Sequence, residues 1–386
     1  MEVEKKLKEE AFVSLVRHNT ESERRVNTIV QRLKSNVNYN LSYEQLWQKV
    51  SSNVATDRLY RESNPALSYV ISALSNAEIT RADISTKGTQ LKLLLRLKGG
   101  QSVFFKPMRY KRDEIIRESP YAGFDRHNGE IVAFHLSRLL RMPLVPITSG
   151  RKIDIENEVK RTASKRLLQT FLKIYNQSTN CFYGRCYYCK PKHSVCPDLE
   201  SGLLEGAAIF LLPQHFTLKR VRSPWQRTYK NNVLARWEVD SRYCHDKLMK
   251  TITIEPHLLN FVDVAIFDYL IGNADRHHYE MFKDVPNSPV LLIDNGKSFG
   301  NPFLDEFTIL APLFQCCVIR KSTYELLLLF LTSRKQLSRA LDELLITDAL
   351  YPLLNDAHLK AIDRRLLTIV ALVNVCIDQN VNKALY

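Results

Sequence analysis

The sequence lacks a hydrophobic run that could cross a bilayer. Its longest apolar runs, such as LLLLFL at Leu326–Leu331, are far shorter than the roughly 18 residues that a membrane helix needs. The N-terminal stretch MEVEKKLKEEAFVSLV is charged from its second residue and contains no apolar signal-peptide core. These absences exclude a membrane-spanning segment in the chain as given, so we expect a soluble chain. Any secretory targeting segment or N-terminal membrane anchor would lie outside it.

Other common patterns are also missing. Internal repeats and low-complexity linkers are absent, which excludes a repeat array and a long disordered connection. The phosphate-binding pattern G-x-G-x-x-G is absent too, because the segment between Lys87 and Lys92 offers a single glycine, Gly88. If phosphates bind here, a side chain such as Gln90 would replace the backbone amides of such a loop.

What the chain does contain is an excess of positive charge. Its 55 Lys and Arg residues outnumber 41 Asp and Glu residues, giving a formal net charge of +14. This favours anionic partners such as nucleotides, phosphates, nucleic acid or sulfated sugars, without choosing among them. A basic surface that only aids solubility fits equally well. The 386 residues suffice for two domains or two lobes around a large core.

Eight cysteines bear on the compartment. Their positions are Cys181, Cys186, Cys189, Cys196, Cys244, Cys316, Cys317 and Cys376. The first three have the C-x4-C-x2-C spacing of a plant-type iron–sulfur site, and the first four could also bind zinc. The even total and the four dispersed cysteines favour disulfides and an oxidising compartment. The acceptor sequons at Asn40 and Asn176 predict N-glycosylation and agree with that compartment.

The hydrophobic pattern predicts a helical arm followed by strands. Residues 1–50 have apolar side chains at helical spacing. Leu91–Leu97 and Ser102–Lys106 are apolar runs joined through a Gly-Gly pair, which is typical of a β-hairpin. Leu203–Pro213 fits a buried strand or a linker.

The remaining periodic segments predict mainly helices. One helix starts near Arg126 and ends before Pro143, and another covers His257–Ile271 with Gly272 as its C-cap. Val290–Ile293 is a short apolar strand that stops at Asp294. Further helices are predicted at Tyr324–Leu331 and Leu359–Ile377. The chain therefore has a strand-bearing first half and a mostly helical second half.

The order of the charged residues suggests phosphoryl transfer. A strand lysine, Lys106, precedes a helix glutamate, Glu130, and two aspartates follow, Asp275 in a polar loop and Asp294 after a strand. In a two-lobed kinase such a lysine neutralises phosphate oxygens and the glutamate holds the lysine in place. One aspartate orients the acceptor hydroxyl, and the other binds the metal that bridges the phosphates.

Spacing strengthens this hypothesis. In the kinase loop H-R-D-x-x-x-x-N, a metal-binding Asn lies five residues after the catalytic Asp. Here the fifth residue after Asp275 is Glu280, an oxygen ligand with a full charge that suits Mn²⁺ or Mg²⁺. Asp294-Asn-Gly stands where kinases have D-F-G, with Asn295 in place of phenylalanine.

Three other interpretations are open at this level. His277 and His278 could bind zinc together with Asp275 and Asp294, which would give a metallohydrolase. The same histidines could instead cap the preceding helix and order the loop. The positive charge could mark a heparin- or nucleic-acid-binding module, although the aromatic residues are not arranged as a stacking ribbon.

Six longer motifs carry a family resemblance. They are GNADRHHYE, LIDNGKSFG, FKPMRY, FDRHNGE, CFYGRCYYC and QCCVIRKSTY. Together they resemble the secretory-pathway kinases that include the Golgi casein kinase and Four-jointed, from about residue 60 to residue 376. The resemblance implies a two-lobed α+β fold of the atypical protein-kinase type, with a strand-bearing N-lobe and a mostly helical C-lobe. We expect a helical arm at residues 1–59, an N-lobe with a cysteine-rich insert at 60–208 and a C-lobe at 209–386.

The resemblance also implies site residues. Asp275 resembles the catalytic aspartate, and Asp125 and Asp294 resemble metal ligands on the nucleotide. The other implied nucleotide-site residues are Gln90, Lys106, Glu130, Ile209, Phe210, Leu211, Leu212 and Glu280, of which Ile209–Leu212 would receive the adenine. The implied disulfides are Cys181–Cys196, Cys186–Cys189, Cys244–Cys316 and Cys317–Cys376.

The family has two branches. One phosphorylates xylose in the proteoglycan linkage region, and the other phosphorylates secreted proteins at Ser-x-Glu. Ala274, the pair Lys297-Ser298 and the two-residue gap between Cys186 and Cys189 resemble the sugar-kinase branch, whereas Gly296 is typical of the protein-kinase branch. The sugar-kinase branch is favoured.

That branch implies a reaction and partners. The implied enzyme is a Golgi phosphotransferase that uses ATP with Mn²⁺ or Mg²⁺ and binds a xylose-containing linkage glycan but no nucleic acid. Asp275 would orient the xylose 2-hydroxyl toward the γ-phosphorus. Trp225 or Trp237 would offer an aromatic floor for the sugar, although a buried tryptophan more often belongs to the core.

Overall fold

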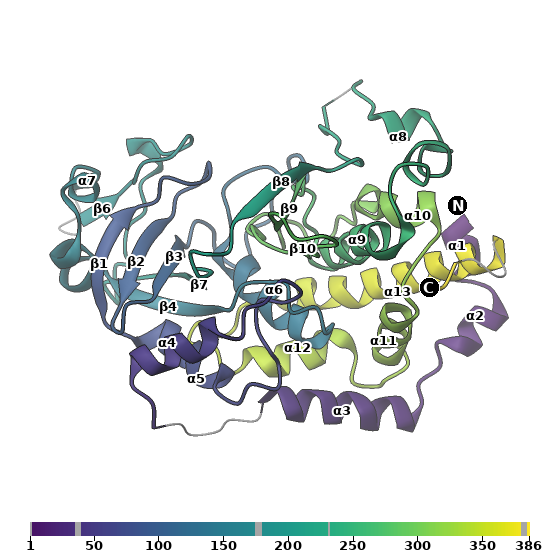
Figure 1. Ribbon diagram of the computed structural model, residues 1–386, viewed down its shortest axis with the longest axis horizontal. Coiled ribbons are helices and arrows are strands. Elements are labelled where there is room, and N and C mark those ends of the chain that lie inside the picture. The colour runs from purple at the N-terminus through teal and green to yellow at the C-terminus, as the bar shows by residue number, and fades with distance from the viewer. Residues whose placement is uncertain (1, 35–39, 174–179, 231, 380–383) are drawn as a thin grey trace.

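A strand-bearing N-lobe and a helical C-lobe lie side by side in the computed structural model (Figure 1). The structure describes residues 2–34, 40–173, 180–230, 232–379 and 384–386. The N-lobe contains the five-stranded sheet, on the left of the figure, and the C-lobe begins with strand β8. This arrangement is the two-lobed α+β architecture that the sequence predicts.

The N-lobe sheet is antiparallel and has the strand order β1-β2-β3-β7-β4. Its strands are β1 (Ile79–Ile84), β2 (Leu93–Leu97), β3 (Ser102–Pro107), β4 (Thr148–Asp154) and β7 (Leu203–Phe210). The predicted hairpin is confirmed as β2 and β3, with Gly99 and Gly100 both at positive φ in the turn. The central strand β3 places Lys106 opposite Ala207 of β7.

Helices cover this sheet and connect it to the C-lobe. They are α4 (Tyr43–Ser51), α5 (Leu67–Asn76), α6 (His127–Leu139) and α7 (Lys165–Leu168), and shorter elements are η1 (Ile155–Lys160), β5 (Phe171–Lys173), β6 (Asn180–Phe182) and η2 (Pro191–His193). Every residue of α6 is buried, because this helix contacts β4 and β7 on one side and α9 and α12 on the other. The helix predicted near Arg126 is therefore the one that spans the lobes.

The C-lobe combines a helical core with a small sheet of order β10-β9-β8. Its strands are β8 (Leu218–Arg222), β9 (His278–Phe282) and β10 (Val290–Leu291). Its helices are α8 (Arg236–Val239), η3 (Cys244–Leu248), η4 (Ile254–Leu258), α9 (Leu259–Ile271), η5 (Phe307–Leu310), α10 (Ala311–Cys316), α11 (Lys321–Leu331), α12 (Leu337–Leu345) and α13 (Asp356–Gln379). None of the helices in the described ranges combines the length and apolarity needed to cross a membrane.

The N-terminal helices run along the C-lobe rather than forming a separate unit (Figure 1). They are α1 (Glu2–Lys6), α2 (Glu10–Leu15) and α3 (Thr20–Lys34). Helix α1 contacts α13, where the Lys6 ammonium pairs with Asp378, and α3 contacts α6, α11 and α12. The domain limits at residues 59 and 208 stay predictions.

Several elements differ from the sequence prediction. Helix α9 begins at Leu259 rather than His257, because the backbone kinks at Glu255 within η4. Strand β10 is two residues shorter than predicted. Strands β1, β4, β8 and β9 were not predicted, since alternation is weak in polar sequences such as TSGRKID and LKRVR.

The structure joins the cysteines in the four pairs that the resemblance implies. Two bridges close the insert in the N-lobe, Cys181–Cys196 and Cys186–Cys189. Cys244–Cys316 connects η3 to α10, and Cys317–Cys376 connects the end of α10 to α13. No cysteine is free, so the cluster cannot supply thiolates to zinc or to an iron–sulfur centre.

Gly272 ends α9 in a left-handed conformation with φ of 66°. An added Cβ would lie 2.9 Å from a terminal nitrogen of the buried Arg365 guanidinium. Replacing Gly272 by alanine should therefore lower the free energy of unfolding by more than the ~1–2 kcal/mol of left-handed strain alone. The matched control is Gly202→Ala, since Gly202 also has positive φ but has open space around it. Equal losses in denaturant unfolding would contradict the crowding by Arg365.

Candidate functional site

The Lys106 ammonium is the centre of the site. Its Nζ donates hydrogen bonds to Asp125 Oδ2 at 2.8 Å, Glu130 Oε1 at 2.6 Å and Asp294 Oδ1 at 2.5 Å. Strand β3 supplies the lysine, α6 and the loop before it supply Glu130 and Asp125, and Asp294 follows β10. Four residues predicted from sequence are thus brought together from segments up to 188 positions apart.

The cluster carries excess negative charge. Three carboxylates surround one ammonium, so the net formal charge is −2. Burial alone would lower the pKa of Lys106, but the fields of Asp125, Asp294 and Glu130 outweigh it and raise that pKa well above its usual value. The Lys106 ammonium in turn holds the pKa of Asp294 far below its usual range. Lys106 and Asp294 are therefore both charged at neutral pH.

The three carboxylates differ in their exposure to solvent. The Asp125 and Glu130 side chains are less than a tenth exposed, whereas the Asp294 side chain is 67% exposed. Gly296 allows the Asp294 segment to approach Asp125, since an added Cβ there would lie 2.6 Å from the Asp125 Cβ. Asp294 and Asp125 therefore lie close together on the solvent-facing side of the cluster, and Glu130 lies on its buried side.

Asn295 stands where protein kinases have phenylalanine, and it is fully buried. Its backbone N–H donates to Glu130 Oε1 at 3.0 Å, and its side-chain amide donates to the Leu292 carbonyl at 2.9 Å. Its amide oxygen accepts from Arg276 at 2.8 Å. Asn295 thus links the helix glutamate to the loop that carries Asp275, through hydrogen bonds instead of apolar packing.

The loop containing Asp275 is held from both sides. The Arg276 guanidinium makes a two-pronged pair with Asp268 of α9, at 2.7 and 2.8 Å, and donates to the Ile293 carbonyl at 2.6 Å. The Asp275 carboxylate itself is about one third exposed and lies 2.9 Å from Nε2 of His277. The fold therefore anchors the loop through Arg276 and leaves the Asp275 carboxylate accessible.

Lys297 is a second cation beside the acidic cluster, and sequence reasoning treated it only as a branch marker. Its ammonium is nearly buried, donates to the Gly123 carbonyl and lies 3.9 Å from Asp125 Oδ1. Burial lowers its pKa, while the carboxylates of Asp125 and Asp275 oppose that shift. Asp275 and Asp125 therefore lie on the same side of the molecule, near one ammonium.

Arg126 fixes the segment that carries Lys297. Its guanidinium donates to the carbonyls of Lys297 and Ser298, each at 2.6 Å, and its backbone N–H donates to the Gly296 carbonyl at 2.7 Å. Asp125 immediately precedes Arg126 in the chain. The two loops that bear Asp125 and Asp294 are therefore tied together by three hydrogen bonds.

Gln90 lies in the loop between β1 and β2 and is half-buried. The cysteine-rich insert supports this loop, because the backbone N–H of Tyr188 donates to the Thr89 carbonyl at 3.2 Å. Two positions after Gln90, Lys92 is close enough to feel the charges of Lys106 and Asp294; burial lowers the pKa of Lys92, and Lys106 lowers it further. The loop thus adds a cation where a glycine-rich loop is missing.

The predicted adenine segment connects the lobes. Ile209 and Phe210 end strand β7 and are buried, and the half-buried Leu211 and Leu212 follow. The Leu211 backbone is bound on both sides, by Ser102 and by the side chain of Gln101. The segment therefore has the position expected of a linker beside the cleft.

Glu280 lies apart from the acidic cluster. It belongs to β9 and pairs with Arg220 of β8, with Arg220 Nε 2.9 Å from Glu280 Oε1. No ion pair in the described part of the chain joins it to Lys106. Sequence reasoning placed it in a polar loop, whereas strand pairing gives it Arg220 as its partner.

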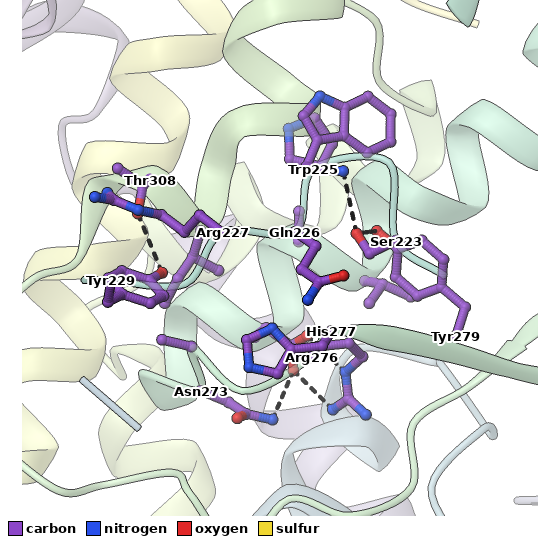
Figure 2. A pocket seen from close by; sticks show the side chains of 16 residues that line it. Ser223, Trp225, Gln226, Arg227, Tyr229, Asn273, Arg276, His277, Tyr279 and Thr308 are labelled. Atoms are coloured by element: carbon purple, nitrogen blue, oxygen red, sulfur yellow. Dashed lines mark hydrogen bonds and ion pairs between the residues drawn. The ribbon is translucent and has the colours of Figure 1, made fainter. Parts of the chain in front are cut away.

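A pocket opens beside the Asp275 loop (Figure 2). It has a volume of about 460 Å³ counted to its open mouth. Ala274, Arg276 and His277 line it from one side, and Gln226 and Arg227 line it from the segment after β8. Figure 2 shows the Gln226 amide and the His277 ring facing each other across it. This pocket joins three segments that are distant in sequence.

The two candidate floor tryptophans have different positions. Trp225 is 6% exposed and lines the pocket, whereas Trp237 is 5% exposed and lies behind it, where its indole N–H donates to the Trp225 carbonyl. Further aromatic lining comes from Tyr229, whose hydroxyl lies 3.2 Å from that of Thr308. Tyr229 was not anticipated from sequence, since it belongs to no recognisable motif.

A zinc site at the histidines is not preformed. Within the described ranges, no group of three or more His, Cys, Asp or Glu side chains is placed to hold a metal ion. His277 pairs with Asp275, while His278 faces β8 in register with Arg222. Of the two sequons, Asn40 is exposed and Asn176 lies outside the described residues.

Comparison with known proteins assigns the chain to a protein family. The family description "Golgi casein kinase, C-terminal, Fam20" matches residues 45–385. The chain belongs to this family. The resemblance drawn from the six motifs, and the kinase-like fold that it implies, are confirmed.

Individual relatives support the same placement. Human glycosaminoglycan xylosylkinase is 46% identical over 336 residues, covering 86% of this chain and 80% of that protein. The structure of hydra Fam20 with sugar matches with a TM-score of 0.83 at 43% identity, over 89% of this chain and 97% of that one. The Golgi casein kinase with Mn/ADP bound matches with a TM-score of 0.81 at 32% identity, over 94% and 91%.

The amide of Asn295 should be needed for the site to assemble. Asn295→Leu keeps a similar volume and the backbone bond to Glu130, but it leaves Arg276 and the Leu292 carbonyl each short of a partner in a buried region. Because an unsatisfied buried polar group costs about 1–3 kcal/mol, unfolding by denaturant should show at least that loss. The matched control is Asn374→Leu, which removes amide bonds to Tyr324 and Val370 far from the cluster. Binding of Mn²⁺–ADP should weaken in Asn295→Leu only; equal weakening in both would refute a role in the site.

Proposed function

We propose that this protein is an ATP-dependent phosphotransferase that phosphorylates the 2-hydroxyl of xylose in the linkage region of proteoglycans. The observation that carries the proposal is the convergence of Lys106, Glu130 and Asp294 beside a pocket bordered by the Asp275 loop. The similarity to human glycosaminoglycan xylosylkinase supports xylose as the acceptor. A disulfide-linked fold supports the Golgi lumen as the compartment.

The acidic cluster has the chemistry to hold a divalent cation with a nucleotide. Its donors are carboxylate oxygens, which suit Mn²⁺ and Mg²⁺, and Asp294, whose side chain is 67% exposed, presents one of them to solvent. We assign Asp125 and Asp294 as the metal-holding residues, and the Golgi casein kinase with Mn/ADP bound supports this pairing of metal and nucleotide. When bound, the ion would neutralise charge on the nucleotide phosphates.

The cations of the cluster act on the triphosphate. Lys106 is fixed by Glu130 and faces the phosphates, and Lys92 and Gln90 approach from the loop between β1 and β2. Ile209–Leu212 are assigned to the adenine. Glu280, in the middle of β9 and paired with Arg220, stays assigned to the nucleotide site only through the family resemblance. Lys297, between Asp125 and Asp275, is placed to offset the charge of the transferred phosphoryl group.

The acceptor sugar fits the pocket of Figure 2. A neutral sugar needs hydrogen-bonding groups and an apolar surface, and the pocket offers Gln226, Arg227 and His277 together with Trp225 and Tyr229. Asp275 lies between the pocket-lining residues Ala274 and Arg276, and we assign it to accept or orient the proton of the attacking hydroxyl. His277, 2.9 Å from the Asp275 carboxylate, positions that carboxylate without taking part in the transfer.

Loss of the Asp275 carboxylate should separate chemistry from nucleotide binding. Asp275→Asn should lower kcat for a galactosyl-xyloside by about 10²–10⁴-fold, the usual contribution of a positioned base. Mn²⁺–ADP should bind as in the unchanged protein, because the metal-holding residues are intact. Radiolabel transfer and calorimetry measure the two quantities. Undiminished turnover would refute the role of Asp275, and labelling of a Ser-x-Glu peptide in place of the xyloside would refute the acceptor.

Replacement of His277 and replacement of the adjacent His278 should have different effects on kcat/KM for the xyloside. His277→Ala removes the partner of Asp275 and part of the pocket wall, so kcat/KM for the xyloside should fall by about 10-fold or more. His278→Ala, the matched control, changes a β9 residue outside the pocket and should fall less than threefold. Steady-state rates measured at fixed Mn²⁺–ATP give kcat/KM for both variants. A metallohydrolase would instead release phosphate without acceptor and would need His278 more than Lys106.

A further inference from the structure

Strand β8 is an exposed, basic sheet edge. It pairs with β9 on one side, and the sheet order β10-β9-β8 leaves its other side open. Four of its five residues are exposed, and three of them are cationic, namely Lys219, Arg220 and Arg222. Within the described residues, no strand covers this edge. Charged residues on an edge strand often have no role beyond preventing aggregation. The position and backbone geometry of β8 therefore indicate whether it binds a partner.

The register identifies the backbone groups that face outward. The Ser223 N–H donates to the His277 carbonyl, and the Lys283 N–H donates to the Thr217 carbonyl. In an antiparallel pair the hydrogen-bonded positions alternate, so the odd-numbered residues of β8 bond to β9. The N–H and C=O groups of Leu218, Arg220 and Arg222 therefore point away from the sheet, as the groups that an added strand would use.

The open edge leads directly to the acceptor pocket. Ser223, Gln226 and Arg227 line that pocket and follow β8 without a break. Five residues at about 3.3 Å each give an edge of roughly 17 Å. The inference rests on the proposed function at this step: a xylose in a glycan–protein linkage keeps its polypeptide near the sugar pocket.

We propose that β8 binds the acidic polypeptide that flanks the glycosylated residue of the substrate, as an added antiparallel or parallel strand. Backbone pairing with Arg220 and Arg222 would supply affinity. The Arg220 guanidinium is already paired with Glu280, so Lys219 and Arg222 would select Glu and Asp in the flanking sequence. Lys283, exposed just beyond β9, extends the basic surface. The substrate is then recognised twice, by its sugar in the pocket and by its peptide on the edge.

Four acceptors test the proposal with Mn²⁺–ATP and the full chain. They are a free galactosyl-xyloside, a galactosyl-xylosyl-serine peptide flanked by Glu, the same glycopeptide with Gln replacing Glu, and the Glu glycopeptide with alternate backbone amides methylated. We expect kcat/KM for the Glu glycopeptide to exceed that for the Gln glycopeptide by about 10-fold or more in low salt. The advantage should shrink as salt rises and should vanish on methylation. Equal kcat/KM values for the Glu and Gln glycopeptides would overturn the proposal, and a methylated glycopeptide that keeps the advantage would overturn the strand pairing.

Reversing the charge of Lys219 and Lys283 tests whether the acidic peptide binds at the β8 edge. Lys219→Glu/Lys283→Glu should abolish the Glu advantage and leave the free xyloside rate unchanged, since neither residue lines the pocket. The matched control, Arg161→Glu/Lys165→Glu, makes the same charge change on exposed residues of the N-lobe and should keep the advantage. An advantage that survives in Lys219→Glu/Lys283→Glu overturns the assignment to β8.

A binding measurement keeps this inference separate from the proposed function. Fluorescence anisotropy with unglycosylated Glu-rich and Gln-rich peptides measures binding to the β8 edge without catalysis. The result therefore tests the peptide-binding proposal even if no xyloside is phosphorylated. Preferential binding of the Glu-rich peptide, lost in Lys219→Glu/Lys283→Glu, supports the proposal. If that variant instead loses only a heparin oligosaccharide, the surface serves sulfated glycans and the polypeptide proposal is wrong.

Discussion

The buried Lys106 ammonium constrains the rest of the structure. Removing a charge from water costs several kcal/mol per ion unless partners with good geometry replace the solvent. Here three carboxylates do so, at 2.5–2.8 Å. They come from the loop before α6, from α6 itself and from the segment after β10, so the N-lobe sheet, the spanning helix and the C-lobe strand must all be in place together. The same packing keeps the Asp125 and Asp294 carboxylates together on one side of Lys106, with Asp294 open to solvent.

The polar linkage continues into the C-lobe. Glu130 contacts Asn295, Asn295 contacts Arg276, and Arg276 makes its paired bonds to Asp268 in α9. A phenylalanine at position 295 could pack but could not bridge two charged groups of opposite sign. The acidic cluster around Lys106 and the loop that carries Asp275 are therefore positioned through one chain of hydrogen bonds, which begins at the buried helix glutamate and ends in the core helix.

Sequence reasoning found the parts of this site that lie in contiguous motifs. Lys106 and Glu130 lie within a strand and a helix that have readable apolar patterns, and Asp275 and Asp294 follow two further such elements. Kinase spacing gave these residues their predicted roles. The pocket was beyond that reasoning, because residues 223–229, 264–279 and 308–312 meet only through tertiary packing. Glu280 shows the same limit, since spacing relative to Asp275 gives its distance along the chain, while its partner Arg220 depends on a strand pair that polar residues conceal.

Charge is distributed so that one substrate can be neutral in one part and acidic in another. The carboxylates around Lys106 would repel an acidic polypeptide at close range, and Lys92 and Lys297 lie beside them as counter-charges. The pocket beside the Asp275 loop offers amide, imidazole and aromatic groups, which suit an uncharged sugar. The exposed edge of β8 is basic and continues directly into Ser223 at the pocket. For the proposed substrate, an acidic polypeptide bearing a neutral sugar, this arrangement favours the orientation with the sugar inward and the peptide along the edge.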